Sequence, residues 1–246
     1  MNYEKISGFT DEISSHLGTA AYRSRQDRDN LIWHYGIDRR EKTSAAIHPG
    51  RLKGQCCQLL KKYKMRVSSL GSPLGKIPIC DEEAFAEQML QAENAAHIAE
   101  ILECSYVRIF SFYIPTGDSH SMWSECAADK VGRLAEVLGR YGITALHENE
   151  KEIFGDTKEH CLELFEKVNS PFLQAAFDFA NFVQCKEEPL KAYRMLEPYV
   201  AYFHIKDALS EKGDTVVCGQ GDGCMETILG DAFGKGYNGF LTLEPH

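Results

Sequence analysis

Short runs rich in β-branched and aromatic residues recur along the chain and alternate with longer stretches of helical periodicity. Six of these runs begin at residues 65, 105, 142, 172, 199 and 239, so successive starts lie 27 to 40 residues apart. That spacing is typical of a strand–helix–strand repeat. The runs predict strands at 5–10, 65–71, 105–112, 142–148, 172–178, 199–205 and 239–244.

An eighth strand is expected before residue 65. The predicted strands at 5–10 and 65–71 start too far apart for one repeat, and the apolar run LIWHYGI at 31–37 falls between them. Eight parallel strand–helix units favour a closed (β/α)8 barrel, or TIM barrel, over an open sheet. The length of 246 residues suits one barrel, and no Pro-, Gly- or Ser-rich linker divides it. Residues 1–246 are therefore predicted to form a single domain.

Two segments depart from a regular barrel. Residues 18–54 contain eight Lys and Arg against four Asp and Glu, and no apolar stripe runs through 18–30. Two interpretations stay open for this irregular first unit: a divergent or loosely ordered segment, and a corrupted stretch such as a local frameshift. The sequence ends at His246, directly after the eighth strand. We therefore expect a truncated barrel that lacks its closing helix and is marginally stable where its first and last strands meet.

Composition argues against several classes of partner. The net charge of −9 disfavours nucleic acid, because a protein that grips phosphates usually has a basic face. The sequence contains no run of about 18 apolar residues, so no membrane span is predicted. The N-terminus lacks the basic and apolar regions of a signal peptide. The nine cysteines form no CxxC pair, which suits reduced thiols in a cytoplasmic protein. The sequence leaves open whether the chain forms a homo-oligomer.

Four ionisable side chains lie at the carboxyl ends of the last four predicted strands. Because side chains alternate between the two faces of a strand, Glu148, Asp178, His204 and Glu244 all face into the barrel. Barrel enzymes build their active sites at this end of the strands. A lone strand-end carboxylate is usually an ion-pair partner or a helix cap, but four such residues on successive strands indicate a shared function.

These four side chains have the chemistry of a metal site. Three carboxylates crowded into one low-dielectric cavity repel one another by several kcal/mol unless a cation compensates them. Three carboxylates and one imidazole offer mainly hard oxygen donors. They favour one divalent ion, Mn²⁺ first, with Mg²⁺ or Co²⁺ as alternatives. Zn²⁺ is less favoured, because structural zinc sites use thiolates or more histidines.

Eight motifs then occur in order along the chain. They are GFTDEIS at 8–14, SSLGSPLGKI at 68–77, VRIFSFYIP at 107–115, LHENEKEIFGDT at 146–157, FDFANFVQC at 177–185, YFHIKDA at 202–208, GQGDG at 219–223 and LTLEPH at 241–246. Together they resemble the sugar phosphate isomerase/epimerase family, a group of xylose-isomerase-like TIM barrels. The resemblance covers residues 1–17 and about 55–246 and is weak over 18–54.

The resemblance implies a reaction and a substrate class. It implies that Glu148, Asp178, His204 and Glu244 bind the metal, that Glu148 and Glu244 are also the catalytic acid/base groups, and that the substrate is a small sugar or sugar phosphate. The expected chemistry is proton abstraction next to a carbonyl, through a metal-bound enediolate. One carboxylate returns the proton at the adjacent carbon in an isomerisation, or the opposite one delivers it to the other face in an epimerisation.

Other motif residues are given less specific roles. The resemblance places Asn181, Lys206 and Asp207 at the substrate or beside the metal ligands. GQGDG at 219–223 is interpreted as a tight glycine turn, with phosphate binding through backbone N–H groups as the alternative. By strand parity, His147 faces the helices and is predicted to be a core histidine.

Three rival functions use the same fold. A dehydratase of keto-sugars or cyclitols would use the same site, because the enolate can expel a β-hydroxyl, and strand-end residues do not separate it from an isomerase. A truncated barrel without catalytic activity is the second alternative. A phosphodiesterase related to abasic-site endonucleases is disfavoured, since it needs a His-rich rim with several zinc ions and a basic face for DNA.

Overall fold

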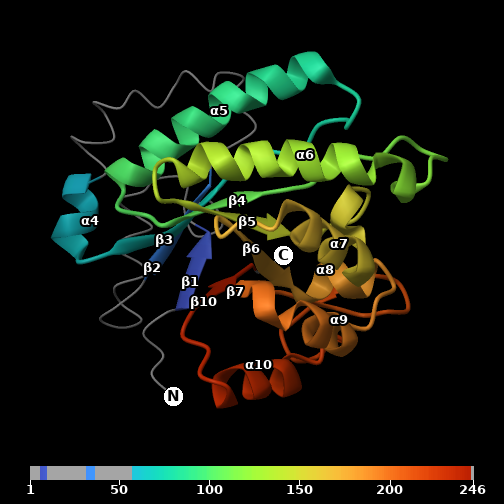
Figure 1. Cartoon of the computed structure of the whole chain (residues 1–246). Helices are drawn as coiled ribbons and strands as arrows, with labels where there is room; N and C mark the ends of the chain where they lie inside the picture. Colours follow the sequence, from blue (N-terminus) through green and yellow to red (C-terminus); the bar gives the residue numbers. More distant parts are fainter. Residues whose placement is uncertain (1–5, 10–31, 37–56, 245–246) are drawn as a thin grey trace.

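Eight short strands close into a parallel barrel, as the spacing of the β-rich runs predicts (Figure 1). The computed structural model describes residues 6–9, 32–36 and 57–244. The barrel strands are β1 (Ile6–Phe9), β2 (Ile32–Gly36), β3 (Arg66–Gly71), β4 (Tyr106–Ile109), β5 (Thr144–Glu148), β6 (Leu173–Asp178), β7 (Val200–Ile205) and β10 (Phe240–Leu243). Hydrogen bonds join them in the order β1-β10-β7-β6-β5-β4-β3-β2.

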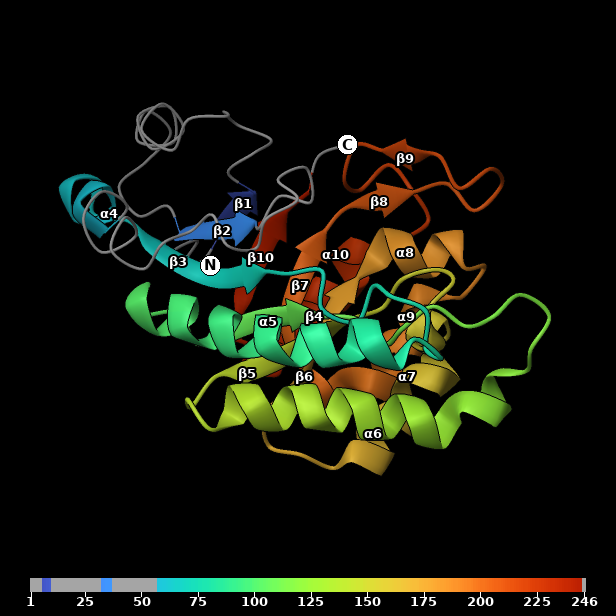
Figure 2. The same cartoon turned by 90° about the horizontal axis from the view of Figure 1, so that it is seen from above.

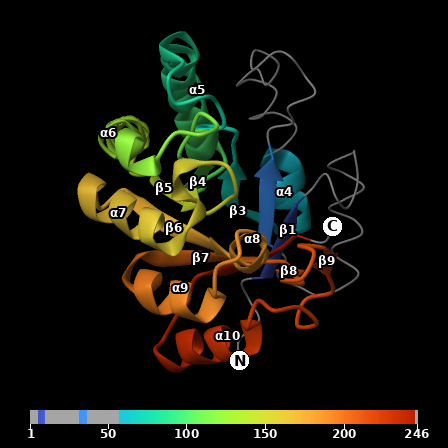
Figure 3. The ribbon, with the colours of Figure 1, turned by 90° about the vertical axis from the view of Figure 1, so that its right-hand side faces the viewer.

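The described helices pack on the outside of the barrel, and Figure 3 shows α5, α6, α7, α9 and α10 following one another around part of it. The described helices are α4 (Cys57–Tyr63), α5 (Glu82–Ile101), α6 (His120–Gly139), α7 (Lys158–Val168), α8 (Phe179–Gln184), α9 (Pro189–Leu196) and α10 (Met225–Gly234), with short 3-10 turns η2 (Phe154–Asp156) and η3 (Glu197–Tyr199). Apolar side chains on the inner faces of these helices pack against the outward faces of the strands in one continuous core. Burying each large apolar side chain contributes about 1.5–3 kcal/mol. Within the described residues, no helix combines the length and hydrophobicity that crossing a lipid bilayer requires.

Capping residues decide where the helices at the carboxyl end of the barrel begin. Asp81 Oδ1 accepts the backbone N–H of Ala84 at 2.9 Å and begins α5. Thr157 Oγ1 accepts the N–H of His160 at 3.2 Å and begins α7. Each such bond satisfies an N–H group that the helix itself leaves without a partner, a gain of about 1 kcal/mol. The loops between strands and helices are therefore held at a defined point.

The expected fold is confirmed, and each of the eight predicted strands has its counterpart in the barrel. The predicted strand at 31–37 is β2, whereas the remainder of the irregular segment 18–54 lies outside the described residues. Leu243 faces outward, as strand parity predicts, and is 45% exposed.

One strand is shorter than the sequence predicts. The run at 105–112 was expected to be extended throughout, but β4 ends at Ile109. Beyond that point the backbone leaves the barrel ladder, since Phe110 N donates to Leu74 O at 2.7 Å. Phe112 then adopts a left-handed conformation, with φ of 71°, which cannot continue a strand. The apolar run continues past Ile109 because Phe112 is still buried, in a loop that packs on the core.

The interior of the barrel is centred on Tyr202 of β7. Its ring packs with Leu146 and Ala176 from the two preceding barrel strands. Its hydroxyl group lies 2.8 Å from Ser68 Oγ on β3 and 2.5 Å from Thr242 Oγ1 on β10. Because β2 and β1 separate β3 from β10 in the barrel, this hydroxyl group links strands that are not neighbours, across the interior and below the strand ends.

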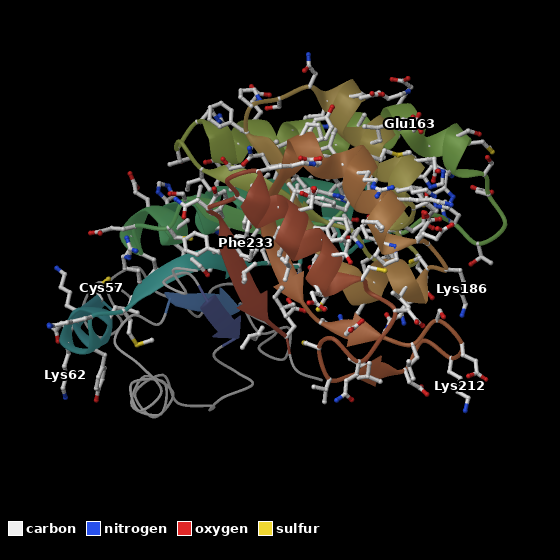
Figure 4. All side chains as sticks on the ribbon, turned by 90° about the horizontal axis from the view of Figure 1, so that it is seen from below. Cys57, Lys62, Glu163, Lys186, Lys212 and Phe233 are labelled. Carbon is white, nitrogen blue, oxygen red and sulfur yellow. The ribbon has the colours of Figure 1, made fainter. Side chains whose placement is uncertain are left out.

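The carboxyl ends of the strands form one end of the molecule. Figure 4 shows Lys186 and Lys212, which follow β6 and β7, at the end opposite α4, which carries Cys57 and Lys62. A small antiparallel sheet of β8 (Asp207–Ala208) and β9 (Thr215–Val216) lies beside α8 at this rim (Figure 2). The sequence analysis did not predict this sheet. It follows β7 directly, so it belongs to the end of the barrel where barrel enzymes bind their substrates.

Candidate metal centre

The register of four strands brings the predicted metal ligands together. Asp178 pairs with His204 across β6 and β7, and His204 pairs with Thr242 across β7 and β10. Glu148 ends β5, and Glu244 follows β10 directly. All four side chains are buried, and each offers one ligand atom within 4.8 Å of the other three.

The His204 imidazole lies between the two glutamates. Its Nδ1 atom is 2.9 Å from Glu148 Oε1 and 3.0 Å from Glu244 Oε1. Burial alone would lower the pKa of His204, but the carboxylates of Glu244 and Glu148 outweigh burial and raise it well above the ordinary value. In the same way, burial opposes ionisation of Glu244, yet His204 holds the pKa of Glu244 below its usual range. Glu148 and Glu244 therefore stay ionised at neutral pH.

A residue that the sequence analysis did not single out completes this group. Arg108, on β4, places Nη1 at 3.1 Å from Glu148 Oε2 and 4.0 Å from Glu244 Oε1. Its guanidinium group also lies over the ring of Phe110, with Cζ 4.9 Å from the ring centroid. Burial raises the pKa of Glu148, but His204 and Arg108 together hold it well below the usual range. The signal in the sequence was strand parity, because Arg108 alternates with the outward-facing Val107 and Ile109.

Asp178 has the environment that a cation requires. Its Oδ1 atom accepts the backbone N–H of Asn181 at 2.8 Å, which begins α8. Its buried Oδ2 atom has no hydrogen-bond partner among the described residues, and Lys206 Nζ lies 3.6 Å away. Burial raises the pKa of Asp178 to about 7, helped by Glu244 and Glu148, although Lys206 opposes the shift. A buried carboxylate oxygen in this setting is costly unless a positive charge reaches it. The donor set therefore fits a divalent ion.

Asn149 positions Asp178 and was also missed by the sequence analysis. Its side-chain Nδ2 donates to Asp178 O at 3.0 Å, and its Oδ1 accepts the N–H of Asp178 at 2.9 Å. Asn181 Nδ2 donates in turn to Asn149 O at 2.9 Å. These bonds join the ends of β5 and β6, so Glu148 and Asp178 are held in a fixed relation.

The three residues that the family resemblance places at the substrate occupy different settings. Lys206 Nζ donates to Asn181 Oδ1 at 3.2 Å and lies beside Asp178. Both side chains are therefore at the candidate metal centre. Asp207 is 1% exposed, and its carboxylate accepts backbone N–H groups instead. The donors are Ala208, Gly219, Gly221 and Gly223, at 2.9 to 3.0 Å.

Those contacts decide between the two interpretations of the GQGDG segment. Three of its backbone N–H groups, at Gly219, Gly221 and Gly223, point at Asp207 and are not available to a phosphate. A Cβ atom at Gly221 would lie 2.4 Å from Asp207 Oδ1, so a side chain does not fit there. The segment is the tight glycine turn, closed around a carboxylate.

His147 is the core histidine that strand parity predicts. It is 1% exposed, and its Nε2 atom lies 2.9 Å from Ser111 Oγ. Its ring packs edge-on against Phe165 of α7, with centroids 5.9 Å apart. Burial lowers the pKa of His147 to about 4, so the ring is neutral at physiological pH.

Comparison with known proteins agrees with the barrel fold. The family described as "Xylose isomerase-like TIM barrel" matches the chain over residues 45–246. Among curated proteins, the 3-dehydroshikimate dehydratase of Bacillus anthracis is 21% identical over 126 residues, which are 51% of this chain. The match spans 45% of that relative, so this chain corresponds to about half of the relative's length.

Two solved structures share the whole architecture. A D-tagatose 3-epimerase-like protein superposes with a TM-score of 0.80 at 17% identity, covering 97% of this chain and 89% of that one. The IolI protein, solved with a zinc atom, has a TM-score of 0.76 at 16% identity, covering 98% of this chain and 88% of its own. At such identities the likeness shows the fold alone.

Proposed function

Since the chain belongs to the xylose isomerase-like TIM barrel family, we propose that it is a divalent-metal-dependent isomerase or epimerase of a sugar or sugar phosphate. One observation carries the proposal most strongly. Three carboxylates and one imidazole, from four successive strands of the second half of the barrel, place ligand atoms within 4.8 Å of one another at the catalytic end. A structural neighbour with the same fold is described as D-tagatose 3-epimerase-like.

Glu148, Asp178, His204 and Glu244 would hold the cation. When bound, a divalent ion supplies a Lewis acid that polarises the substrate carbonyl and stabilises the negative charge that develops on its oxygen. We propose Mn²⁺, with Mg²⁺ or Co²⁺ as alternatives, because three of the four donors are carboxylates. Zn²⁺ belongs in the same test, since the IolI structure contains it.

Glu148 and Glu244 would move the protons. Glu148 ends β5 and Glu244 follows β10, and β6 and β7 separate these two strands in the barrel, so the two carboxylates would approach a substrate from different sides. Both carboxyl groups have a pKa below the usual range and are ionised at neutral pH, so either one can accept a proton from the carbon next to a carbonyl. Returning the proton through the same carboxylate gives isomerisation, and delivery through the other gives epimerisation.

The remaining polar residues would position the substrate. Lys206 Nζ and Asn181 lie beside Asp178, so they are placed to hydrogen-bond substrate oxygens. Asp207 would act indirectly, because its carboxylate is bound to the glycine turn and shapes the rim next to Lys206. The expected substrate is a small polyol with a carbonyl group.

A dehydratase reaction on the same site is the second candidate. The observation that favours it is the match to a 3-dehydroshikimate dehydratase. The first step is shared, since a carboxylate again removes the proton next to a carbonyl. The reactions then diverge, because in the dehydratase the carboxyl group that took this proton gives it to a β-hydroxyl group, which leaves as water. Product analysis separates them, since dehydration yields an enone whereas isomerisation keeps every hydroxyl group.

The test is incubation with Mn²⁺ in D₂O, using panels of ketoses, aldoses, cyclitols and their phosphates. Solvent deuterium should enter the carbon next to the carbonyl in at least one substrate. Glu148→Gln and Glu244→Gln should lose turnover by about 10²- to 10⁴-fold, the usual size of a general acid/base contribution. Glu150→Gln is the matched control, because Glu150 lies at the same rim but pairs with Lys76. Exchange that persists in both active-site variants, with metal bound, would exclude these residues as the proton carriers.

A further inference from the structure

A second group of potential metal ligands lies outside the barrel mouth. His120 is the first residue of α6, Asp156 ends the turn η2, and His160 is in the first turn of α7. Each side chain offers one ligand atom, and these atoms lie within 4.8 Å of one another. None of the three contributes to the site formed by Glu148, Asp178, His204 and Glu244.

The two imidazoles share one carboxylate. His160 Nδ1 is 2.9 Å from Asp156 Oδ1, and His120 Nε2 is 3.3 Å from Asp156 Oδ2. Among the described residues, Asp156 forms ion pairs with these two histidines alone. His120 Nε2 is buried, and within the described part of the chain it has no partner that meets hydrogen-bond geometry. Two nitrogen atoms and one carboxylate oxygen therefore lie close enough together to share one ion.

The surroundings favour an ion over a simple hydrogen-bonded cluster. The two rings are stacked, with centroids 4.2 Å apart and planes 7° from parallel. Phe154, which is fully buried, closes one side, with its ring 5.9 Å from His120 and 5.5 Å from His160. The three ligand side chains are only 21% to 28% exposed. Low polarity strengthens attraction for a cation, while this remaining exposure leaves room for water to complete the coordination.

We infer that His120, Asp156 and His160 form a second, peripheral Zn²⁺ site. Two imidazoles and one carboxylate match the ligand preference of zinc, whereas three carboxylates and one imidazole in the barrel suit a harder ion. Because the rings are parallel, one of them must tilt for both nitrogens to reach the same ion. Partial exposure of both histidines permits that rotation.

An ion at this site would stabilise two loops at the catalytic end of the barrel. His120 begins the helix that follows β4, whereas Asp156 and His160 follow β5, which ends at Glu148. An ion held by all three therefore ties two successive strand–helix loops together. One of these loops leads directly from a proposed catalytic residue into α7. Zn²⁺ bound here is expected to stabilise the fold without taking part in the reaction.

Zn²⁺ binding to the full-length chain tests the inference separately from the proposed function. In Asp178→Ala, where the barrel site is disabled, one Zn²⁺ per chain should remain after desalting, as measured by elemental analysis. Adding His160→Ala or His120→Ala to this variant should weaken Zn²⁺ binding by more than about 100-fold, the upper end of the effect of losing an outer partner of a ligand. Competition with a chromogenic chelator gives the dissociation constants.

Two controls separate ligation from folding. His97→Ala removes a histidine that is 55% exposed on α5 and should leave Zn²⁺ affinity unchanged. His160→Gln keeps a hydrogen-bond donor for Asp156 but removes the imidazole, so it should retain the metal-free melting temperature and lose the Zn²⁺-dependent increase. If Zn²⁺ affinity in the His120 and His160 variants equals that of His97→Ala, the inference is overturned. The same conclusion follows if Asp178→Ala binds no Zn²⁺.

Discussion

The guanidinium group of Arg108 and the carboxylate of Glu148 form an ion pair inside the barrel mouth, with Nη1 3.1 Å from Oε2. Arg108 is on β4 and Glu148 is on the neighbouring strand β5, where Arg108 pairs in register with Leu146. Both side chains are largely withdrawn from water, with 19% and 4% of their areas exposed. The positive charge therefore compensates a carboxylate that would otherwise be costly to bury.

We predict that Arg108→Met destabilises the metal-free protein by about 3 kcal/mol, because removing one partner of a buried pair leaves the other charge uncompensated. Saturating Mn²⁺ should recover much of that loss, since the ion replaces the missing positive charge. Urea denaturation with and without Mn²⁺ measures both effects. Arg140→Met removes an exposed ion pair with Glu93 and should cost less than about 1 kcal/mol in either condition. A deficit in Arg108→Met that Mn²⁺ does not change would contradict the prediction.

Metal affinity should depend on pH through Asp178. Burial raises the pKa of Asp178 to about 7, so a proton competes with the cation for this carboxylate. Mn²⁺ affinity is expected to fall by at least about tenfold for each pH unit below about 7, since one or more protons must leave on binding. The raised pKa of His204 acts in the same direction. Calorimetry between pH 5 and 8, in buffers of different ionisation enthalpy, would report the proton release; an affinity independent of pH would count against it.

Acid should destabilise the fold through His147. Burial lowers the pKa of His147 to about 4 in the folded state, whereas the unfolded value is about 6.5. Below about pH 6.5, His147 binds a proton in the unfolded chain but not in the folded chain. The free energy of unfolding therefore falls as the pH drops from about 6.5 to 4. The full shift corresponds to about 3 kcal/mol. His147→Gln removes the imidazole that titrates. The free energy of unfolding of this variant, measured by denaturation at each pH, should therefore change less between pH 6.5 and 4. Parallel profiles for the two proteins would show that His147 does not contribute.

The hydroxyl group of Tyr202 should contribute to the stability of the fold. Tyr202→Phe deletes a group that contacts Ser68 on β3 and Thr242 on β10 and leaves their buried hydroxyl groups with one partner fewer. Each such loss costs about 1–3 kcal/mol, so we expect a loss of at least that size in the free energy of unfolding. Tyr106→Phe, a neighbour whose ring packs edge-on against Tyr202, is the comparison and should cost less. Equal melting temperatures for all three proteins would disprove the role of the hydroxyl group.

The sequence predicted the barrel and the four clustered side chains for one physical reason. Side-chain direction alternates strictly along a strand, so Glu148, Asp178, His204 and Glu244 could be assigned to one face without knowing any tertiary contact. The same alternation places Arg108 on the inner face of its strand. A positively charged residue was not expected, however, to belong to a site formed by carboxylates. Its role depends on the distance to Glu148, which comes from the packing of neighbouring strands.

Features built from loops could not be predicted in this way. The early end of β4 depends on a hydrogen bond from Phe110 to Leu74, which are far apart in the sequence. The group of His120, Asp156 and His160 has a partial signal, because Asp156 and His160 are four residues apart at a helix start. Nothing in the sequence indicates that His120 joins them. Loop conformation depends on such contacts between distant residues, and periodicity does not record them.

The carboxylate of Asp207, held by the amides of three alternate glycines, has a consequence for how this rim can vary. Both ends of the intervening excursion, residues 209–218, are anchored at one side chain, since Ala208 N and Gly219 N both donate to Asp207. Asp207 itself lies three residues after His204 on the same stretch of chain. Residues 209–218 therefore form a loop whose two ends are held together by the Asp207 side chain. We therefore expect that a new specificity loop can be grafted between these two anchors while His204 and Lys206 keep their places.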